Sequence, residues 1–291
     1  MSKTWFITGA SRGLGSDIAK AALAAGHHVV ATGRKRASVV AAIGEDSERL
    51  LSLDLDVSKE AQARVAVDAA VQRFGVIDVL VNNAGFGYMG FFEDSTTDDM
   101  YDQLSTNLLG VMHVTRATLP HMRKARSGHI FNVSSLGGML GAELGSLYCA
   151  TKFGLEGFSE CLAKEVAQFG LAVTIVQPGP FRTDFLKPES ARYAKVGVVD
   201  YAERRRQLIA STEQRNGNQP GDPARLAKAM IRLAEVPNPP MRFLGGSIAL
   251  NAAVAKLATW RGEAEAWKDL SVSCDGDFEN TNVGLLLDQI R

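Results

Sequence analysis

The sequence predicts an α/β protein built on one doubly wound parallel sheet of about seven strands, flanked by helices and followed by a C-terminal extension. Short β-branched, apolar segments alternate with helix-like segments along most of the chain, and a glycine-rich turn follows the first of them. The 291 residues, 46% hydrophobic and 22% charged, are enough to bury one large core. We therefore predict one domain over residues 1–246 and an extension over residues 247–291.

A glycine-rich turn follows the first expected strand. The run Thr4–Thr8 is apolar, glycines stand at positions 9, 13 and 15, and Asp17–Ala25 has the alanine, leucine and isoleucine pattern of a helix. Glycines let the backbone approach a pyrophosphate closely, and a helix N-terminus presents free N–H groups to an anion. This unit predicts a phosphate-binding loop; a tight turn that binds no ligand is the alternative.

The later elements continue the alternation of strand and helix. The expected strands are His28–Gly33, Leu50–Leu55, Asp78–Asn82, His129–Ser135, Ala172–Gln177 and Met241–Leu244. The expected helices are Arg36–Ile43, Lys59–Phe74, one long or two consecutive helices over Met100–Lys124, then Ser146–Phe169 and Pro223–Ala234. Residues 180–221 are charged and rich in loop-forming residues, and we interpret them as a mobile lid over the substrate.

Charge and cysteine usage exclude several classes of protein. The 32 basic and 32 acidic residues balance, so no overall field attracts nucleic acid or an anionic membrane. Cys149, Cys161 and Cys274 are not spaced as metal ligands, and we expect reduced thiols and no metal site. No apolar run approaches the ~18 residues of a membrane span, and no secretory signal pattern begins the chain. We expect a cytoplasmic protein.

Tyr148 and Lys152 are the first candidates for chemistry. On a helix, residues four apart share a face, so the phenol and the ammonium would act on one small volume. A fixed cation favours the phenolate and lowers the pKa of a tyrosine, which would make Tyr148 a general acid/base. An isolated match to this spacing also arises by chance, as an exposed lysine beside a half-buried tyrosine.

Several motifs in order make the sequence resemble the short-chain dehydrogenase/reductase family, whose members share a Rossmann fold. Thr-Gly-x-x-x-Gly-x-Gly stands at residues 8–15, Asn-Asn-Ala-Gly at 82–85, and Ser135 lies thirteen positions before Tyr148. Asn107 lies in Thr-Asn-Leu-Leu-Gly, and Pro178-Gly179 with Thr183 match the segment that contacts the nicotinamide end. The resemblance covers about residues 3–245.

The resemblance implies a catalytic set of Asn107, Ser135, Tyr148 and Lys152. NAD(P)H would deliver hydride to a carbonyl carbon while Tyr148 donates the proton, and alcohol oxidation would reverse these steps. Lys152 would lower the pKa of the tyrosine and bind the nicotinamide ribose. Ser135 would polarise the substrate oxygen, and Asn107 would support a proton relay. The alternatives are a helix-kink or capping role for Asn107 and a turn hydroxyl for Ser135.

Charge at the end of the second strand favours NADP(H), with NAD(H) possible. An acidic residue at that place would bind the adenosine ribose of NAD and repel a 2′-phosphate, but Gly33 stands there, followed by Arg34. Arg12 is a second guanidinium suited to a phosphate. The full set of expected cofactor contacts is Gly9, Ser11, Arg12, Gly13, Leu14, Gly15, Arg34, Asp56, Val57, Asn83, Ala84, Gly85, Tyr148, Lys152, Pro178, Gly179 and Thr183.

The residues expected to line the substrate pocket are largely apolar or aromatic, which suggests a lipophilic ketone or aldehyde and the corresponding alcohol. They are Phe86, Tyr88, Leu136, Met139, Phe181 and Phe185, with Leu140, Pro180 and Leu186 beside them. The segments after Ser135 and around Tyr148 look similar to the steroid and retinoid dehydrogenase branch. The alternative is that these residues are ordinary core and loop positions.

Two other function classes use related sequences. A catalytically silent NADP-binding regulator would share the fold, but it would be expected to have lost the tyrosine or the lysine. A sugar-nucleotide epimerase or dehydratase also uses Tyr-x-x-x-Lys, with differently spaced glycines and a longer substrate domain. For assembly we expect a homodimer paired through the helices at Asn107–Lys124 and Ser146–Phe169, with a tetramer disfavoured by the extension after Ser247.

Overall fold

The computed structural model describes residues 2–187, 190–195 and 197–276. It divides into two compact units, Met1–Leu250 and Asn251–Arg291, and the expected polar tail beyond residue 276 lies outside the described residues. Within the described part, no helix is both long and apolar enough to cross a membrane.

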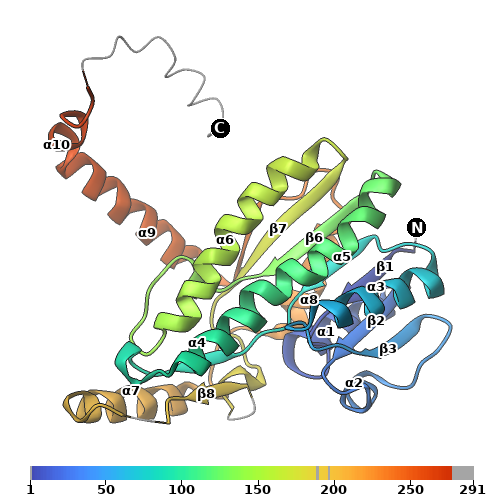
Figure 1. Cartoon of the computed structure of the whole chain (residues 1–291), viewed down its shortest axis with the longest axis horizontal. Coiled ribbons are helices and arrows are strands. Elements are labelled where there is room, and N and C mark those ends of the chain that lie inside the picture. Colours follow the sequence, from blue (N-terminus) through green and yellow to red (C-terminus); the bar gives the residue numbers. More distant parts are fainter. Residues whose placement is uncertain (1, 188–189, 196, 277–291) are drawn as a thin grey trace. The chain divides into compact units, whose positions relative to one another are not determined.

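A seven-stranded sheet forms the centre of the first unit (Figure 1). Its strands are β1 (Thr4–Ile7), β2 (His28–Gly33), β3 (Leu50–Asp54), β4 (Val79–Asn82), β6 (Gly128–Val133), β7 (Leu171–Pro178) and β9 (Arg242–Gly245). The spatial order is β3-β2-β1-β4-β6-β7-β9, and every neighbouring pair is parallel. The prediction of a doubly wound parallel sheet is confirmed. The order reverses direction at β1 and β4, where such sheets bind ligands beyond the carboxyl ends of their strands.

Helices cover both faces of the sheet, so its strands are apolar on both sides. One face carries α1 (Gly13–Ala24), α2 (Arg36–Ile43) and α8 (Pro223–Leu233), and the other carries α3 (Glu60–Phe74), α5 (Gly110–Ala125) and α6 (Ser146–Ala167). Side chains of a strand alternate between faces. Accordingly, Trp5 and Ile7 of β1 pack against the first set of helices, while Phe6 packs against the second.

A chain of buried polar contacts joins the second set of helices to the sheet. Asn82 Nδ2 donates to Asn132 Oδ1 at 2.8 Å and to Thr115 Oγ1 of α5 at 3.0 Å. Asn132 Nδ2 in turn donates to Ser159 Oγ of α6 at 2.8 Å. All four side chains are buried. A buried polar group left without a partner is costly, so these contacts fix how α5 and α6 sit along the strands.

The helix expected over Met100–Lys124 is one continuous helical run with a defect in its middle. It comprises α4 (Thr97–Leu104), a π-helical turn (Ser105–Leu109) and α5. The defect surrounds Asn107, and single π turns of this kind often occur at functional sites.

The lid segment has more regular structure than the sequence predicts. Strand β8 (Ala191–Tyr193) pairs in parallel with β5 (Gly87–Met89), and α7 (Ala202–Arg215) follows. These two strands have three residues each, which is too short for a periodicity to be read from sequence. After β9, α9 (Ser247–Ala266) begins in the first unit and continues into the second, where α10 (Lys268–Val272) follows it.

Candidate active site

A cavity of about 760 Å³ opens at the carboxyl ends of the parallel strands. Residues one or two positions after β1, β2, β3, β4, β6 and β7 line it: Gly9, Arg34, Leu55, Asn83, Ser134 and Gly179. The first turn of α1 and the lid segment complete its walls. This is the place where an open parallel sheet binds ligands.

The glycine turn lies against the loop after β4 so closely that side chains are excluded. A Cβ on Gly9, whose φ is +68°, would lie 2.8 Å from Ala84 Cα, and a Cβ on Gly15 would lie 2.3 Å from the Gly9 oxygen. Asn83 Nδ2 donates to the carbonyls of Thr8 and Gly9 at 3.0 and 3.1 Å. The two loops therefore form one rigid wall of the cavity.

The structure brings nearly all the expected cofactor residues to this cavity. Those that line it are Gly9, Ser11, Arg12, Gly13, Leu14, Arg34, Asp56, Val57, Asn83, Ala84, Gly85, Tyr148, Lys152, Pro178, Gly179 and Thr183. Gly15 is the exception, because it faces the Gly9 backbone and the Asn83 amide instead. Sequence reasoning missed Ser58 and Lys59, which also line the cavity; nothing in their spacing marks them.

A side chain at the place of the acidic residue of an NAD-binding site would collide with a neighbouring side chain here. Gly33 is buried at the end of β2, and a Cβ on it would lie 2.9 Å from Val39 Cγ2. Arg34 is exposed and lines the cavity. Arg36, in contrast, is held by Asp46 at 2.8 Å and by the Ser52 carbonyl at 3.1 Å. Arg34 is therefore the guanidinium of this basic run that faces the cavity.

Ser135, Tyr148 and Lys152 line the inner part of the cavity. Tyr148 and Lys152 lie one turn apart on α6, with Lys152 Nζ 5.8 Å from the centre of the Tyr148 ring. Lys152 Nζ donates to the Val133 carbonyl at 2.7 Å, so β6 fixes its position. Ser135 follows β6, and its Oγ accepts the N–H of Gly137 at 3.1 Å.

Burial dominates the protonation of this pair. Desolvation raises the pKa of the Tyr148 phenol to about 12, although the neighbouring Ser135 hydroxyl lowers it. Desolvation also lowers the pKa of the Lys152 ammonium to about 8, and the charge of Glu156 opposes this. The expected net fall of the Tyr148 pKa is wrong for this structure, because removal from water raises the pKa by more than neighbouring groups lower it.

Asn107 is fully buried in the π turn and lines the cavity with one edge. Its Oδ1 accepts the N–H of Phe86 at 3.1 Å, and its Nδ2 donates to the Phe86 carbonyl at 2.9 Å. These paired contacts hold the loop after β4 in place. The contacts thus give Asn107 a local structural task beside any role in catalysis.

The apolar wall of the cavity differs in part from the expected substrate pocket. Phe86, Leu136, Pro180, Phe181, Phe185 and Leu186 line it, together with Met89, which the sequence reasoning missed. Tyr88 does not: its ring is 1% exposed and its hydroxyl donates to Asp99 Oδ2 at 3.3 Å. In a strand, neighbouring side chains point to opposite sides, so β5 turns Met89 toward the cavity and Tyr88 into the core. Met139 and Leu140 also lie outside the lining.

Polar side chains of the lid and of α4 close the outer end of the cavity. Arg192 lies 4.3 Å above the Phe86 ring and pairs with Asp102 at 2.5 Å. Arg215 of α7 also lines the cavity; its guanidinium donates to Thr212 Oγ1 at 3.2 Å. The pair of Arg192 with Asp102 joins residues 90 positions apart, and no motif signals it. The cavity lining therefore combines apolar side chains with charged ones, Arg192, Arg215 and Asp102 among them.

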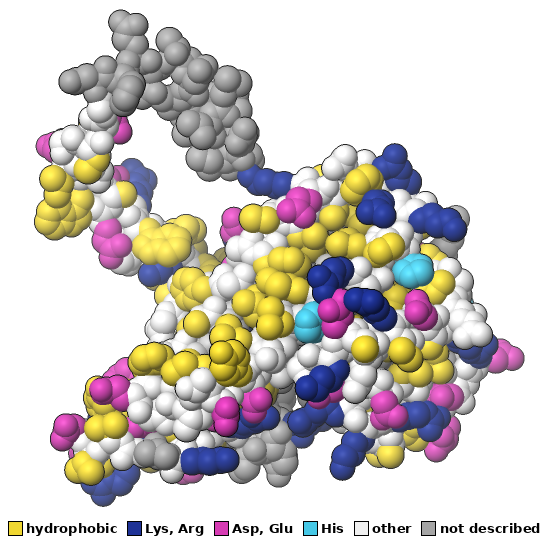
Figure 2. All heavy atoms as spheres, viewed as in Figure 1, with side chains coloured by type: hydrophobic (Ala, Val, Ile, Leu, Met, Phe, Trp, Pro, Cys, Tyr) yellow, Lys and Arg dark blue, Asp and Glu magenta, His cyan; other side chains and the backbone are white. Residues whose placement is uncertain are grey.

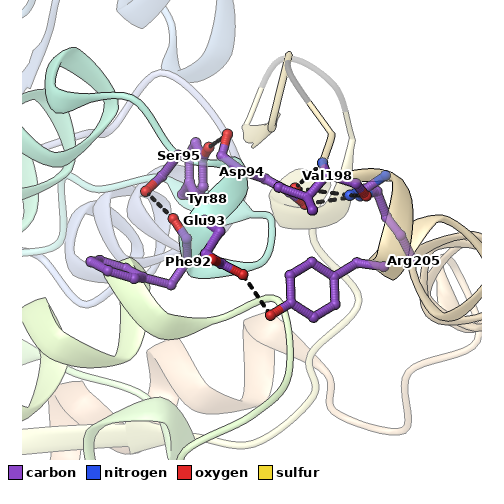
Figure 3. A network of polar contacts seen from close by, with 8 residues as sticks. Tyr88, Phe92, Glu93, Asp94, Ser95, Val198 and Arg205 are labelled. Carbon is purple, nitrogen blue, oxygen red and sulfur yellow. Dashed lines mark hydrogen bonds and ion pairs between the residues drawn. The ribbon is translucent and has the colours of Figure 1, made fainter.

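Within the first unit, a buried ion pair joins α7, in the segment 180–221, to the turn before α4 (Figure 3). Arg205 of α7 donates to both carboxylate oxygens of Asp94, at 2.9 and 2.8 Å, and the N–H of Val198 donates to Asp94 Oδ1 at 2.9 Å. Burial opposes the charge of Asp94, but these donors hold the pKa of its carboxyl below the usual value. Beside the pair, the Tyr201 hydroxyl donates to Glu93 at 2.6 Å.

The comparisons with known proteins agree with this site. Residues 3–194 match the family model described as "short chain dehydrogenase". The chain is 38% identical over 279 residues to oxidoreductase BOA17 of Botryotinia fuckeliana, covering 94% of this chain and 99% of that protein. It is 37% identical over 256 residues to a 3-ketodihydrosphingosine reductase of Bacteroides thetaiotaomicron, covering 87% and 91%. The chain belongs to the short-chain dehydrogenase family of oxidoreductases.

Solved structures show the same fold. A short-chain dehydrogenase from Streptomyces avermitilis superposes with a TM-score of 0.83 at 38% identity, over 94% of this chain and 100% of that one. A structure described as ElxO with NADP bound superposes with a TM-score of 0.66 at 30% identity, over 81% and 92%. The family assignment therefore rests on both sequence and structure; neither comparison identifies the steroid and retinoid branch.

The lid attachment gives a first prediction. Asp94→Asn removes the charge that pairs with Arg205, and loss of one partner of a buried ion pair generally costs about 3–5 kcal/mol. Because Arg205 is still partly exposed to water, we expect a loss of stability at or below the lower end of this range. Amide hydrogen exchange in Ala202–Arg215 should then accelerate roughly tenfold or more. Glu203→Gln is the control: it removes the exposed partner of Arg206 and should change the exchange rate little. Equal exchange in both variants would contradict the attachment.

Proposed function

We propose that this protein interconverts a lipophilic ketone or aldehyde and the corresponding alcohol by hydride transfer with NADP(H). The observation that carries the proposal is the common cavity: the glycine turn, Ser135, Tyr148, Lys152 and an apolar wall all line it. Family membership independently supports an oxidoreductase. A screen of ketones and secondary alcohols with NADPH and NADP, followed by nicotinamide absorbance, tests the proposal.

The proposed chemistry assigns one task to each catalytic residue. The nicotinamide supplies or accepts the hydride when it is bound. Tyr148 gives a proton to the oxygen of the substrate during reduction, and its raised pKa keeps the phenol protonated at neutral pH. Ser135, directly after β6, holds the same oxygen. Lys152 provides a positive charge near the phenol, and Asn107 holds the loop that carries Phe86.

The cofactor preference follows from charge and space at the end of β2. Gly33 has no room for an acidic side chain, and the guanidinium groups of Arg12 and Arg34 line the cavity. Guanidinium groups bind phosphate well, so a 2′-phosphate would be stabilised. The NADP in the ElxO structure is consistent with this preference, and NAD(H) remains a possible second cofactor.

The substrate proposal follows from the walls of the cavity. Phe86, Leu136, Phe181 and Phe185 favour an apolar body next to Tyr148, and the names of relatives, a 3-ketodihydrosphingosine reductase among them, describe reduction of a keto group. A steroid- or retinoid-like substrate is a narrower version of the same proposal. A catalytically silent regulator or a sugar-nucleotide enzyme would be favoured instead if no ketone or alcohol were turned over.

We further propose a homodimer. Hydrophobic side chains gather over α4, α5 and α6 in Figure 2, and those exposed on these elements and the π turn are Tyr101, Leu104, Leu109 and Phe153. Apolar surface of this kind often marks an interface. A two-fold axis would place the same surface on both copies.

The cofactor preference can be tested by exchanging one charge. Wild-type protein should have a higher kcat/KM with NADPH than with NADH. Arg34→Asp should reverse or abolish this preference, since it replaces a phosphate-binding cation by an anion. Arg36→Asp is a useful control because Arg36 is paired with Asp46. Equal kcat/KM for both cofactors in the wild type would refute the preference.

The proton transfer can be tested at Tyr148. Tyr148→Phe should bind NADPH almost normally while kcat falls by about 10² to 10⁴, the usual contribution of general acid catalysis. Lys152→Met should lower both NADPH affinity and kcat, and it should move the acidic limb of alcohol oxidation to higher pH because the phenolate loses a nearby cation. Nearly full turnover in Tyr148→Phe would show that another group donates the proton.

The interface can be tested with charges. Light scattering should show a dimer for the wild type at micromolar concentration. Leu104→Glu with Phe153→Glu should give monomers, because two charges would be buried against their copies. Val65→Glu, at an exposed apolar residue of α3, should stay dimeric. A wild-type monomer would exclude the dimer, and a tetramer would show that the C-terminal extension does not prevent further assembly.

A further inference from the structure

Behind the catalytic pair, α6 carries a third ionisable residue on the same face. Glu156 lies one helical turn beyond Lys152, as Lys152 lies one turn beyond Tyr148, and residues at this spacing are neighbours on a helix. Lys152 and Glu156 are each 6% exposed. Glu156 is not among the residues that line the cavity. A carboxyl group in such a place requires an explanation, because burying it without compensation is costly.

The surroundings of Glu156 compensate for part of this cost. Gln177 Nε2, from β7, donates to Glu156 Oε1 at 3.1 Å, and Arg242 Nε, from β9, lies 3.5 Å from Glu156 Oε2. The loop after β6 approaches from the other side: a Cβ on Gly138 would lie 2.5 Å from Ser134 Oγ and 2.8 Å from Glu156 Oε1. Two strands, β7 and β9, and the loop after β6 thus converge on one carboxylate.

Few charged groups surround Lys152 and Glu156, so the effect of each on the protonation of Lys152 can be measured separately. On α6, Lys152 faces the Tyr148 phenol on one side and Glu156 on the other. Glu156 faces Arg242 of β9, and Glu160, one further turn along α6, also pairs with Arg242. Glu160 differs from Glu156 in that its side chain is exposed.

We propose that Glu156 is a positioning residue for the reaction: its carboxylate, held by Gln177 and Arg242, keeps the buried Lys152 amine in its cationic form beside Tyr148. The catalytic part of this inference, a role in the reaction, rests on the proposed function. The geometry supports this role, because Lys152 donates to the neutral Val133 carbonyl, while Glu156 lies one turn away on the same helix and is equally buried.

The electrostatics of the site agree with this role. Burial lowers the pKa of Lys152 to about 8, and Glu156 is the group that raises it. Burial raises the pKa of Glu156, while Ser134, Gln177 and Arg242 lower it. Without the Glu156 charge, the pKa of Lys152 would fall further, and a larger fraction of the amine would be neutral at pH 7.

The experiment measures protonation of Lys152 without relying on turnover. NADPH affinity, followed by fluorescence between pH 6 and pH 10, should fall as the amine becomes neutral. In Glu156→Gln the midpoint should lie lower by roughly one pH unit or more, the size expected for removing a charge one helical turn away. Glu160→Gln is the matched control, since it removes a carboxylate from the same helix and from the same arginine; its midpoint should stay at the wild-type value.

A second readout separates positioning from a purely structural role. In alcohol oxidation, Glu156→Gln should move the acidic limb of kcat to higher pH, as Lys152→Met does, while Glu156→Asp should stay close to wild type because it keeps the charge. If Glu156 only ties α6 to β7, Glu156→Gln should lower thermal stability and leave the pH profiles of NADPH affinity and of kcat unchanged. That result would overturn the proposal.

The outcome remains informative if Glu156→Gln does not fold or if no substrate is found. In the wild type, the carboxyl ¹³C resonance of Glu156 should show an inflection at the pKa of the Lys152 amine, measured by its ¹⁵N resonance. Absence of this coupling would refute the proposal. Coupling in a protein that turns over no ketone or alcohol would support the Glu156–Lys152 relation and refute the proposed function instead.

Discussion

The position of α6 on the sheet is the constraint on which the site depends. The helix is fixed by buried polar contacts: Asn132 donates to Ser159, Lys152 to the Val133 carbonyl, and Gln177 to Glu156. Apolar packing tolerates small shifts, whereas these hydrogen bonds fail together if the helix slides or rotates. Through them β6 and β7 set the height of Tyr148 above the sheet, and catalysis needs that position within a fraction of an ångström.

The same contacts explain how the helix carries charge into a dry interior. A lysine and a glutamate each removed from water are unfavourable alone, and they remain ionised only with partners on several sides. Here the partners come from three strands: the Val133 carbonyl of β6, Gln177 of β7 and Arg242, the first residue of β9. The sheet therefore does more than present loops, because it also supplies hydrogen-bond and ion-pair partners to the buried side chains of α6.

Sequence reasoning recovered what depends on local pattern and failed where burial or distant pairing decides. The parallel sheet, the glycine turn and the one-turn spacing of Tyr148 and Lys152 follow from periodicity and from residue type. Tyr88 was misplaced because a three-residue strand gives no readable alternation. The pKa of Tyr148 was expected to fall, yet it rises, since sequence shows a nearby cation but not the loss of water. Asp94 and Arg205 are 111 residues apart and no motif links them.

The two walls of the cavity are held in place by different kinds of contact. The cofactor side is fixed by backbone contacts that exclude side chains, as at Gly9 and Gly15, so most substitutions there would disrupt the loops themselves. The substrate side is attached through side-chain contacts such as the pair of Asp94 with Arg205 and that of Asp102 with Arg192. The two walls still meet at two places. Asn107 holds the loop that carries Phe86, and the Phe185 ring lies 5.6 Å from the Tyr148 ring. A change at Phe86 or Phe185 would therefore act on the proton-transfer residues as well as on the substrate wall, whereas Arg215 lies on α7, away from both contacts.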